Sequence, residues 1–170
     1  MEIRARCFFD FDSVSALSQL SMYRRLKPKR GFIIIASFSQ FSLLASLILV
    51  HSRSLAVISL AILLFISFMH FAYPRIQFRA LKKLQYMENE YIFLDDHIEV
   101  LSKSAEYTGT AELKYSLIPK AAENSRYFFI YQSGNAVFIV DKTTITGGSA
   151  ADIRDKLLSH VGKNYMLCKY

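Results

Sequence analysis

The chain has 170 residues, enough for one domain or for a small domain with a membrane element. Apolar residues make up 52% of it, and its two cysteines, Cys7 and Cys168, stand at opposite ends of the chain. Two such cysteines exclude a disulfide framework and a cysteine-based metal site, and we expect reduced thiols in a cytoplasmic setting. The formal net charge of +7 is compatible with a nucleic-acid-binding protein, so the location of the charge matters.

The basic excess lies in the first half of the chain. Residues 1–89 hold 12 Lys and Arg against 4 Asp and Glu, whereas residues 90–170 hold 9 against 10. The basic residues cluster at 24–30 and 74–83, on both sides of a long apolar tract. Basic flanks are typical of membrane spans, whereas a nucleic-acid surface needs a basic face on a folded module. We therefore expect no nucleic-acid partner.

Residues 1–30 predict a strand and an amphipathic helix. Apolar and polar residues alternate from Ile3 to Cys7, which is typical of a strand with one buried face. A helical spacing of apolar residues follows, with Asp12 or Ser13 as its N-cap.

Residues 31–73 predict a transmembrane hairpin. No Asp, Glu, Lys or Arg occurs in 31–50 or in 55–73, and the first of these segments spans about 30 Å as a helix. A single helix through both would be about twice as long as the membrane core is thick, and it would place Arg53 inside. Two antiparallel helices with their tip at 51–54 avoid both problems. Too little chain remains to bury two such helices in a soluble core.

The basic residues also predict the orientation of this hairpin. Nine Lys and Arg lie in its two flanks, whereas the tip holds Arg53 alone. The positive-inside rule then places both termini in the cytoplasm and the tip outside. We expect a multi-pass protein of the cytoplasmic (inner) membrane, with the lipid bilayer as its first partner.

Polar residues within the two spans are candidates for helix packing. Serines recur at spacings of three and four, and such small residues let helix backbones approach closely. Folding at the tip places Ser46 level with Ser59. Gln40 lies near mid-membrane, so its amide needs a partner on another helix, within one chain or between chains. The packing candidates are Gln40, Ser42, Ser46, Ser59, Ser67 and His70.

Residues 74–89 predict a basic amphipathic connector helix. Apolar residues share one arc of it, and the basic residues Arg75, Arg79, Lys82 and Lys83 share another. Two interpretations stay open. The basic arc binds anionic lipid headgroups, or the helix packs on the domain that follows.

Residues 90–165 predict a small cytoplasmic β domain. Short segments rich in β-branched and aromatic residues alternate with turn residues, as in an antiparallel sheet. Ser149 is a suitable N-cap for a last helix, which Gly162 ends. The fold class is thus α+β, with a two-helix transmembrane hairpin and a small antiparallel β domain closed by a C-terminal helix.

The order of these elements resembles the YcxB-like family of small bacterial membrane proteins. The resemblance is carried by "YIFLDDHIEVLS", "AELKYSLIPK" and "RYFFIYQSGNAVFIVDK", with a strand pair around an acidic turn and a strand that ends near Lys142. Pro119 and Asp141 depart from the residues that the family usually has there. The resemblance implies a pleckstrin-homology-like β domain and a bacterial inner-membrane location, and it implies no particular activity.

No pattern in the chain predicts catalysis. Asp95, Asp96 and His97 are candidate metal ligands or acid–base groups, but adjacent strand residues point to opposite faces, and a solvated turn explains them better. "TGGS" at 146–149 lacks the lysine of a phosphate loop, which favours a helix cap. We therefore expect no enzyme, no cofactor and no metal.

Two hypotheses for the function follow. The first is a membrane protein whose cytoplasmic β domain is an interaction module for an unknown protein partner or for lipid. The second is an accessory subunit of a transporter or channel, formed by oligomerised hairpins. It rests on the serines of the spans and on Gln40, and it makes the protein a homo-oligomer.

Overall fold

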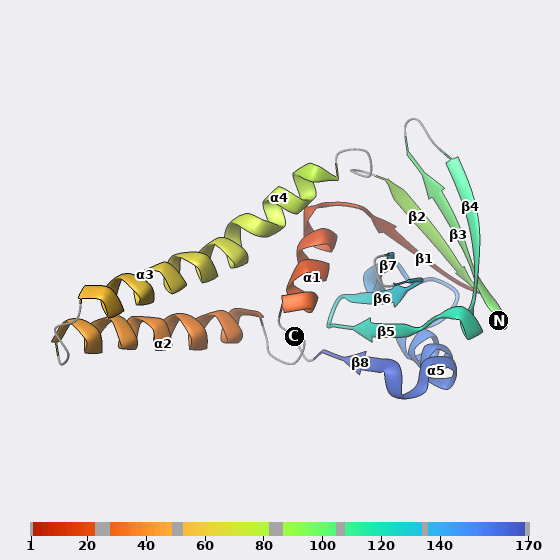
Figure 1. Cartoon of the computed structure of the whole chain (residues 1–170). Coiled ribbons are helices and arrows are strands. Elements are labelled where there is room, and N and C mark those ends of the chain that lie inside the picture. The colour runs from red at the N-terminus through yellow and green to blue at the C-terminus, as the bar shows by residue number, and fades with distance from the viewer. Residues whose placement is uncertain are drawn as a thin grey trace.

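The chain forms a helical hairpin and a β domain (Figure 1). It begins in the β domain, leaves it for the hairpin and then returns to it. Its class is α+β, as the sequence predicts. The computed structural model describes residues 2–22, 28–48, 53–81, 87–104, 108–133 and 136–168.

Two long apolar helices form the hairpin. Helix α2 (Pro28–Ile48) and helix α3 (Arg53–Ser67) pack side by side. The stretches Arg30–Ile48 and Arg53–Ala80 are long and apolar enough to cross a membrane. Most side chains of these two stretches are exposed, in contrast to those of a typical core helix. Positions 49–52, which hold half of the predicted tip, lie outside the described residues.

A π-helical turn continues the second apolar helix toward the β domain. The π-helix η1 (Phe68–Ala72) leads into helix α4 (Tyr73–Ala80). The N–H of Tyr73 donates to the carbonyl of Phe68, five residues back. Pro74 explains the wider turn, because proline has no N–H to donate and its ring would collide with the carbonyl four residues before it. The chain is thus helical without a break from α3 to the end of α4.

The first sheet joins the N-terminal strand to the strands that follow the hairpin. All of its neighbouring strands are antiparallel. Its order is β1 (Ile3–Phe8), β2 (Glu88–Phe93), β3 (His97–Lys103) and β4 (Thr108–Lys114). The predicted N-terminal strand is confirmed as β1, and its partner β2 comes only after the hairpin. The hairpin is therefore an insertion between two adjacent strands of one sheet.

The second sheet contains the remaining strands of the domain. Its order is β7 (Val137–Asp141), β6 (Tyr127–Tyr131), β5 (Lys120–Glu123) and β8 (Tyr165–Leu167). The sequence predicts one antiparallel sheet closed by the last helix. The structure instead has two sheets, and β8 runs parallel to β5 after that helix. The reason is the open edge of β5, whose backbone groups find partners only when β8 reaches them.

Helix α5 (Ala150–Val161) packs on β5, β8 and the short 3-10 helix η3 (Tyr115–Leu117). Its predicted ends are confirmed. The Ser149 side chain accepts the N–H of Asp152 in a capping box, and Gly162 follows the last turn with a φ of 55°. A short 3-10 helix, η5 (Gly162–Asn164), then leads into β8.

Helix α1 (Phe11–Met22) begins two or three residues earlier than its sequence suggests. Its cap is Asp10, whereas the sequence favours Asp12 or Ser13. The carboxylate of Asp10 accepts the N–H of Ser13 at 2.8 Å, and the hydroxyl of Ser13 accepts the N–H of Asp10 at 3.1 Å. This reciprocal pair gives the N–H of Ser13 a partner, which a cap at Asp12 would not supply, and the N–H of Asp10 a second partner beside the carbonyl of Phe8.

The apolar core lies between the two sheets. Its largest fully buried side chains come from β2, η3 and β6: Tyr91, Phe93, Tyr115, Phe128 and Phe129. Strand β1 adds its alternating inner residues Ile3, Ala5 and Cys7. Each large apolar side chain contributes about 1.5–3 kcal/mol by its burial, so the N-terminal strand is an integral part of the domain.

A buried carboxylate ties α5 to the second sheet. Glu123 of β5 is fully buried, and its Oε1 accepts the Nε–H of Arg154 from α5 at 2.7 Å. Lys142, in the 3-10 turn η4 (Lys142–Thr144), places its Nζ 3.0 Å from Oε2, as an ion pair that is not aligned as a hydrogen bond. Burial acts to raise the pKa of Glu123, but the hydrogen bond from Arg154 and the charges of Arg154 and Lys142 outweigh it and hold the pKa below its ordinary value.

Removing one cationic partner should leave the negative charge of the buried Glu123 carboxylate incompletely neutralised. We expect Arg154→Met to lower the free energy of unfolding by about 2 kcal/mol. This is less than the roughly 3–5 kcal/mol of a fully buried pair, because Lys142 remains and Arg154 is partly exposed. Urea unfolding of the detergent-solubilised protein, followed by maleimide labelling of the buried thiols of Cys7 and Cys168, measures the difference.

The pH dependence of this effect has a definite sign. Because the folded pKa of Glu123 is depressed, its stabilisation is present above the ordinary Glu pKa and is lost as the pH falls through the folded pKa. The two proteins should therefore converge in stability at acid pH. Lys163→Met is the control, since Lys163 is exposed and forms no ion pair with a described residue. Equal stability of Arg154→Met and wild type at neutral pH would contradict the prediction.

Candidate functional site

Serine side chains join the two apolar helices. The hydroxyl of Ser39 donates to the carbonyl of Ser59 at 2.9 Å, and the hydroxyls of Ser42 and Ser59 lie 3.1 Å apart. Ser46 is buried and donates to a carbonyl of its own helix at 2.8 Å. The expectation that Ser46 lies level with Ser59 is wrong by about one turn. Helix α2 ends at Ile48 and α3 begins at Arg53, each two residues earlier in the chain than predicted. Residues of α2 that lie beside a given residue of α3 are therefore earlier in the chain by about one helical turn.

The remaining packing candidates lie in different surroundings. Gln40 is exposed on α2 and makes no hydrogen bond to any described residue, and Ser37, almost one turn before it, is exposed as well. Ser67 is half-buried. His70 stacks on Phe32 of α2, with ring centroids 4.4 Å apart and planes at 25°. The structure therefore brings Ser42 and Ser59 together and leaves Gln40 on the outer surface of the hairpin.

The hairpin meets the β domain where α4 packs on α1. Phe78 of α4 and Phe11 of α1 meet edge to face, with ring centroids 5.9 Å apart. A cavity of about 310 Å³ lies between the two helices. Its walls are Phe9, Val14, Leu17, Ser18, Ser21, Gln77, Ala80 and Leu81.

The basic residues of α4 stay on its surface. Arg75 and Arg79 are exposed, and the Nη1 of Arg75 donates to the carbonyl of Phe71 at 2.7 Å. The other two headgroup candidates, Lys82 and Lys83, lie outside the described residues. Along α4, packing on the domain and an exposed basic surface therefore occur together.

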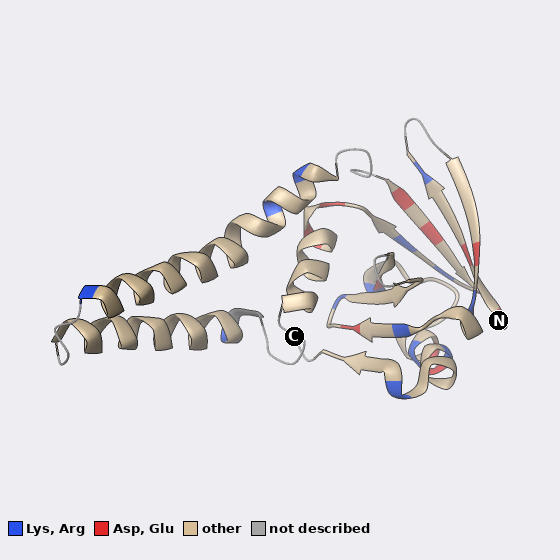
Figure 2. Ribbon diagram, viewed as in Figure 1, with Lys and Arg blue, Asp and Glu red and all other residues tan. Residues whose placement is uncertain are grey.

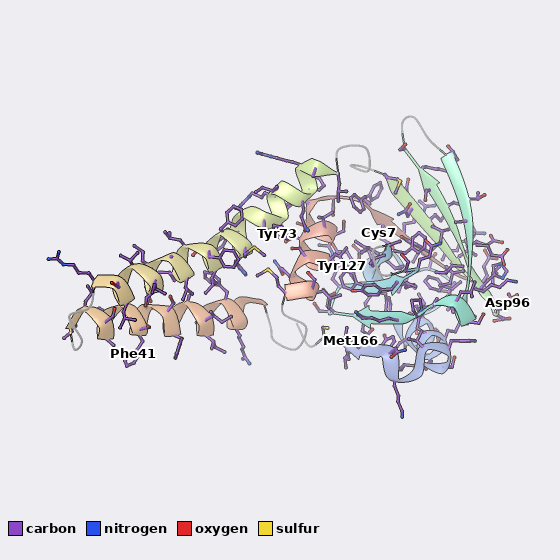
Figure 3. The ribbon with its side chains drawn as sticks, in the orientation of Figure 1. Cys7, Phe41, Tyr73, Asp96, Tyr127 and Met166 are labelled. Atoms are coloured by element: carbon purple, nitrogen blue, oxygen red, sulfur yellow. The ribbon has the colours of Figure 1, made fainter. Side chains whose placement is uncertain are left out.

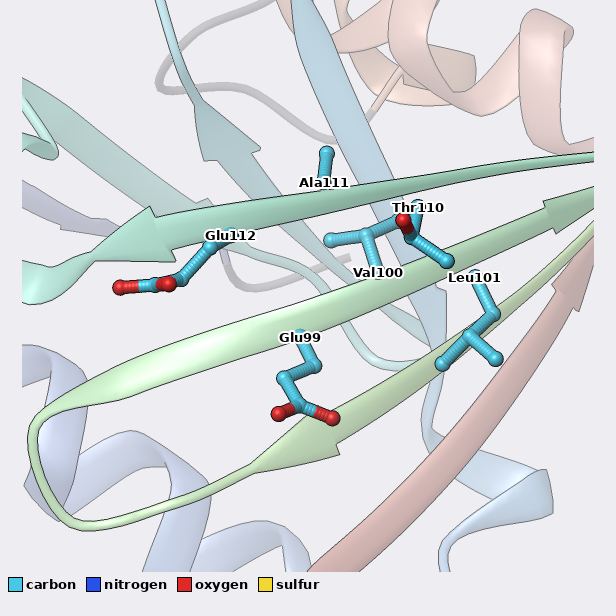
Figure 4. A pocket seen from close by; sticks show the side chains of 6 residues that line it. All are labelled: Glu99, Val100, Leu101, Thr110, Ala111 and Glu112. Carbon is cyan, nitrogen blue, oxygen red and sulfur yellow. The ribbon is translucent and has the colours of Figure 1, made fainter.

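Strand β4 forms a free edge of the first sheet. It pairs with β3, and no other described strand pairs with its outer side. A shallow hollow of about 320 Å³ lies along it, lined by Glu99, Val100, Leu101, Thr110, Ala111 and Glu112 (Figure 4). Glu99 and Glu112 are directly opposite each other, and like charges in this position destabilise a sheet. His97 Nε2 lies 3.7 Å from the Oε1 of Glu99, so part of this repulsion is offset when the ring is protonated. The edge thus combines free backbone groups with a pair of facing carboxylates.

The acidic turn between β2 and β3 is held by ion pairs. The Oδ1 of Asp95 lies 2.9 Å from the Nζ of Lys156 on α5, and the Oδ1 of Asp96 lies 2.6 Å from the Nδ1 of His97. The hydrogen bond with Asp96 is the main cause that raises the pKa of His97, while partial desolvation opposes it. The predicted turn is confirmed at Asp95 and Asp96, and His97 is the first residue of β3.

The other titratable candidates do not converge on one site. Within the described ranges, no group of three His, Cys, Asp or Glu side chains is placed to hold a metal ion. Cys7 and Cys168 are buried and are not joined in a disulfide, and burial raises the pKa of the Cys7 thiol to about 12. His160 stacks on Tyr115, with ring centroids 4.8 Å apart. His51 lies outside the described residues.

A family comparison bears on the β domain. Residues 93–157 match the family model described as YcxB-like protein. The match runs from the last residue of β2 into α5, so it lies wholly within the β domain. No curated protein and no solved structure matches the chain.

A disulfide can test the contact between Ser42 and Ser59. We expect the double variant Ser42→Cys/Ser59→Cys to form a bond within one chain on mild oxidation, because the two hydroxyl oxygens lie 3.1 Å apart. Loss of both new thiols, counted by the gel shift that a maleimide-linked polymer causes, measures it. The control pair is Ser37→Cys/Ser59→Cys, since Ser37 is exposed on α2. Equal oxidation of both pairs would contradict the packing of α2 on α3.

Proposed function

We propose that the chain, which carries a YcxB-like domain at residues 93–157, is a two-span protein of the bacterial inner membrane. Both of its termini and its β domain lie in the cytoplasm. The β domain is an interaction module of the pleckstrin-homology type, and it binds an extended segment of another protein at the free edge of β4.

The insertion of the hairpin between β1 and β2 is the observation that carries this proposal. Both ends of the hairpin meet the same side of the β domain, and α4 packs on α1 through Phe78 and Phe11. A domain tied to the membrane at two points has one orientation. Its far end, where Asp96 lies, points away from the hairpin, whereas Phe41 lies on the hairpin (Figure 3). A cytoplasmic partner can therefore reach this end without meeting the bilayer.

The charges of the hairpin support the membrane location. In the described part of the hairpin and of α4, charged residues occur only near the ends of the apolar stretches (Figure 2). Arg30, Arg75 and Arg79 lie toward the β domain, whereas Arg53 alone lies at the start of α3. Basic residues gathered at one end of a hairpin favour the cytoplasmic side for that end.

The arrangement of the strands supports the pleckstrin-homology assignment that the resemblance implies. Four antiparallel strands, β1 to β4, precede three more, β5 to β7, and a helix follows them. The hairpin occupies the first connection between strands. This placement explains how a small sheet domain can be anchored without a separate linker.

The backbone of β4 supports strand addition as the binding mode. The N–H of Tyr115 donates to the carbonyl of Asp96 at 3.4 Å, and antiparallel pairs alternate in their hydrogen bonding. Thr110 and Glu112 therefore turn their N–H and carbonyl groups outward, where an added strand can pair with them. A lysine or arginine of that strand would relieve the repulsion between Glu112 and Glu99. Simple attraction to anionic lipid is less favoured here, because residues 90–170 hold about as many acids as bases.

Thiol labelling of Thr110→Cys tests both the topology and the covered edge. We expect a membrane-impermeant maleimide to label this position in inside-out vesicles and not in right-side-out vesicles. We also expect labelling in native membranes to be several-fold slower than in the purified protein, because a bound strand covers the edge.

The matched control for this experiment is Lys163→Cys, an exposed position between α5 and β8. It should also be labelled in inside-out vesicles only, but at the same rate in native membranes as in the purified protein. Labelling of Thr110→Cys from outside the cell would refute the topology. Equal labelling rates in native membranes and in purified protein would refute the covered edge.

A second candidate function is an accessory subunit built from oligomerised hairpins. The exposed amide of Gln40, with Ser37 almost one turn away, is the observation that favours it. The outer face of α3 carries large apolar residues such as Ile58, Ile62 and Phe65. An amide carries both donors and an acceptor, so two copies of α2 can pair Gln40 with Gln40.

Gln40→Leu tests this second candidate. We expect it to weaken self-association in mild detergent by about three- to tenfold, the range of one interhelical hydrogen bond in a membrane. Sedimentation equilibrium measures the change, and Phe41→Leu is the control on the neighbouring position. A monomeric wild type, or an unchanged association constant in Gln40→Leu, would refute the paired hairpins.

A further inference from the structure

The cavity between α1 and α4 lies where the second apolar stretch meets the β domain. Ala80 ends the stretch Arg53–Ala80, and it also forms part of the cavity wall with Leu81. The opposite wall comes from α1, through Val14 and Leu17. If the hairpin spans a bilayer, this cavity lies at the level of the lipid headgroups and glycerol backbone.

Two polar groups at this cavity have no partners within the described residues. Ser18 is 4% exposed, and its hydroxyl oxygen is buried without a hydrogen bond. The amide of Gln77 on the facing helix makes no hydrogen bond to a described residue either. A buried hydroxyl without a hydrogen bond is destabilising, so a ligand that accepts a hydrogen bond from it would be favoured.

The character of the cavity restricts the ligand. Its walls are mostly apolar, and the Ser18 hydroxyl and the Gln77 amide can both donate hydrogen bonds. A suitable ligand thus has apolar methylenes next to oxygens that accept. Its volume of about 310 Å³ is at the lower limit of small-molecule sites, too small for a whole phospholipid.

We propose that the cavity holds the ester region and the first methylenes of one acyl chain of a membrane glycerophospholipid. The proposal rests on the membrane insertion proposed above. The ester oxygens accept hydrogen bonds from Ser18 and Gln77, and the methylenes pack on Leu17 and Ala80. The rest of the lipid stays in the bilayer. The cavity is too small to enclose it, so neighbouring lipids surround that part.

This site explains why α1, a helix of the β domain, stands against the end of a span. The bound lipid fills the space that Phe11 and Phe78 leave open beside their contact. It thereby links the domain to the bilayer by a third connection, in addition to the two ends of the hairpin.

Photolabelling of the full chain in vesicles tests the site. The probe is a phosphatidylcholine with a diazirine on one acyl chain next to the ester, in phosphatidylcholine vesicles. After illumination, mass spectrometry locates the label on proteolytic peptides. We expect label on α1 (Phe11–Met22) as well as on α2 and α3. A second arm uses the same diazirine on phosphatidylglycerol, and a third uses it on a free fatty acid.

Two variants and a control give the result its specificity. Ala80→Trp fills the cavity, and label on α1 should fall several-fold. Ser18→Ala keeps the cavity open but removes the donor, and label on α1 should fall as well. Ile76→Trp is the control, because Ile76 is exposed on α4 and does not line the cavity. This control should label like the wild type.

The outcomes separate this site from the proposed function. Label on α2 and α3 without label on α1 would overturn the lipid site and leave membrane insertion intact. No label on any helix would overturn the insertion itself. Unchanged label on α1 in Ala80→Trp would also overturn the site. Label from the free fatty acid alone would overturn a bilayer lipid as the ligand.

Discussion

The pairing of β1 with β2 is the interaction on which the rest of the molecule depends. The two strands pair from Ile3 with Phe93 to Phe8 with Glu88, although the whole hairpin lies between them in the chain. Closing so long a loop costs entropy, but this cost grows only slowly with loop length. It is smaller still when the inserted segment folds by itself and brings its own ends together. The contact of α2 with α3 does this, so the sheet and the hairpin each help the other to form.

The same pairing determines what surrounds the domain. Because β1 enters one edge of the first sheet, no described strand covers the opposite edge at β4. On the second sheet, β8 closes the edge of β5, and Glu123 anchors α5 beside it through Arg154. Among the described strands, the edge at β4 stays open, and Glu112 on it faces Glu99 of the neighbouring β3. The position of the free edge is thus a consequence of how the chain closes.

Local patterns predicted much of this fold. The apolar tract identified both long helices, the alternation of residues identified β1, and Ser149 with Gly162 marked both ends of α5. These features depend on neighbours in the chain. The partner of β1, the second sheet and the order of its strands depend on contacts between distant segments, which periodicity does not record. The same holds for the candidate sites. Serine spacing pointed to Ser42 and Ser59. In contrast, the surroundings of Ser18, Thr110 and Glu123 depend on contacts between elements that are distant in the sequence.

The π-helical turn before Pro74 has a consequence for the angular phase of the last helical segment. A π-turn holds one residue more than an α-turn, so every side chain after it is rotated by about 100° compared with a regular continuation. Phe78 and Gln77 face α1 only because of this offset. In a straight helix another face of α4 would meet the domain, and Arg75 and Arg79 would change direction with it. The π-turn before Pro74 therefore determines how the β domain is rotated about the axis of α3.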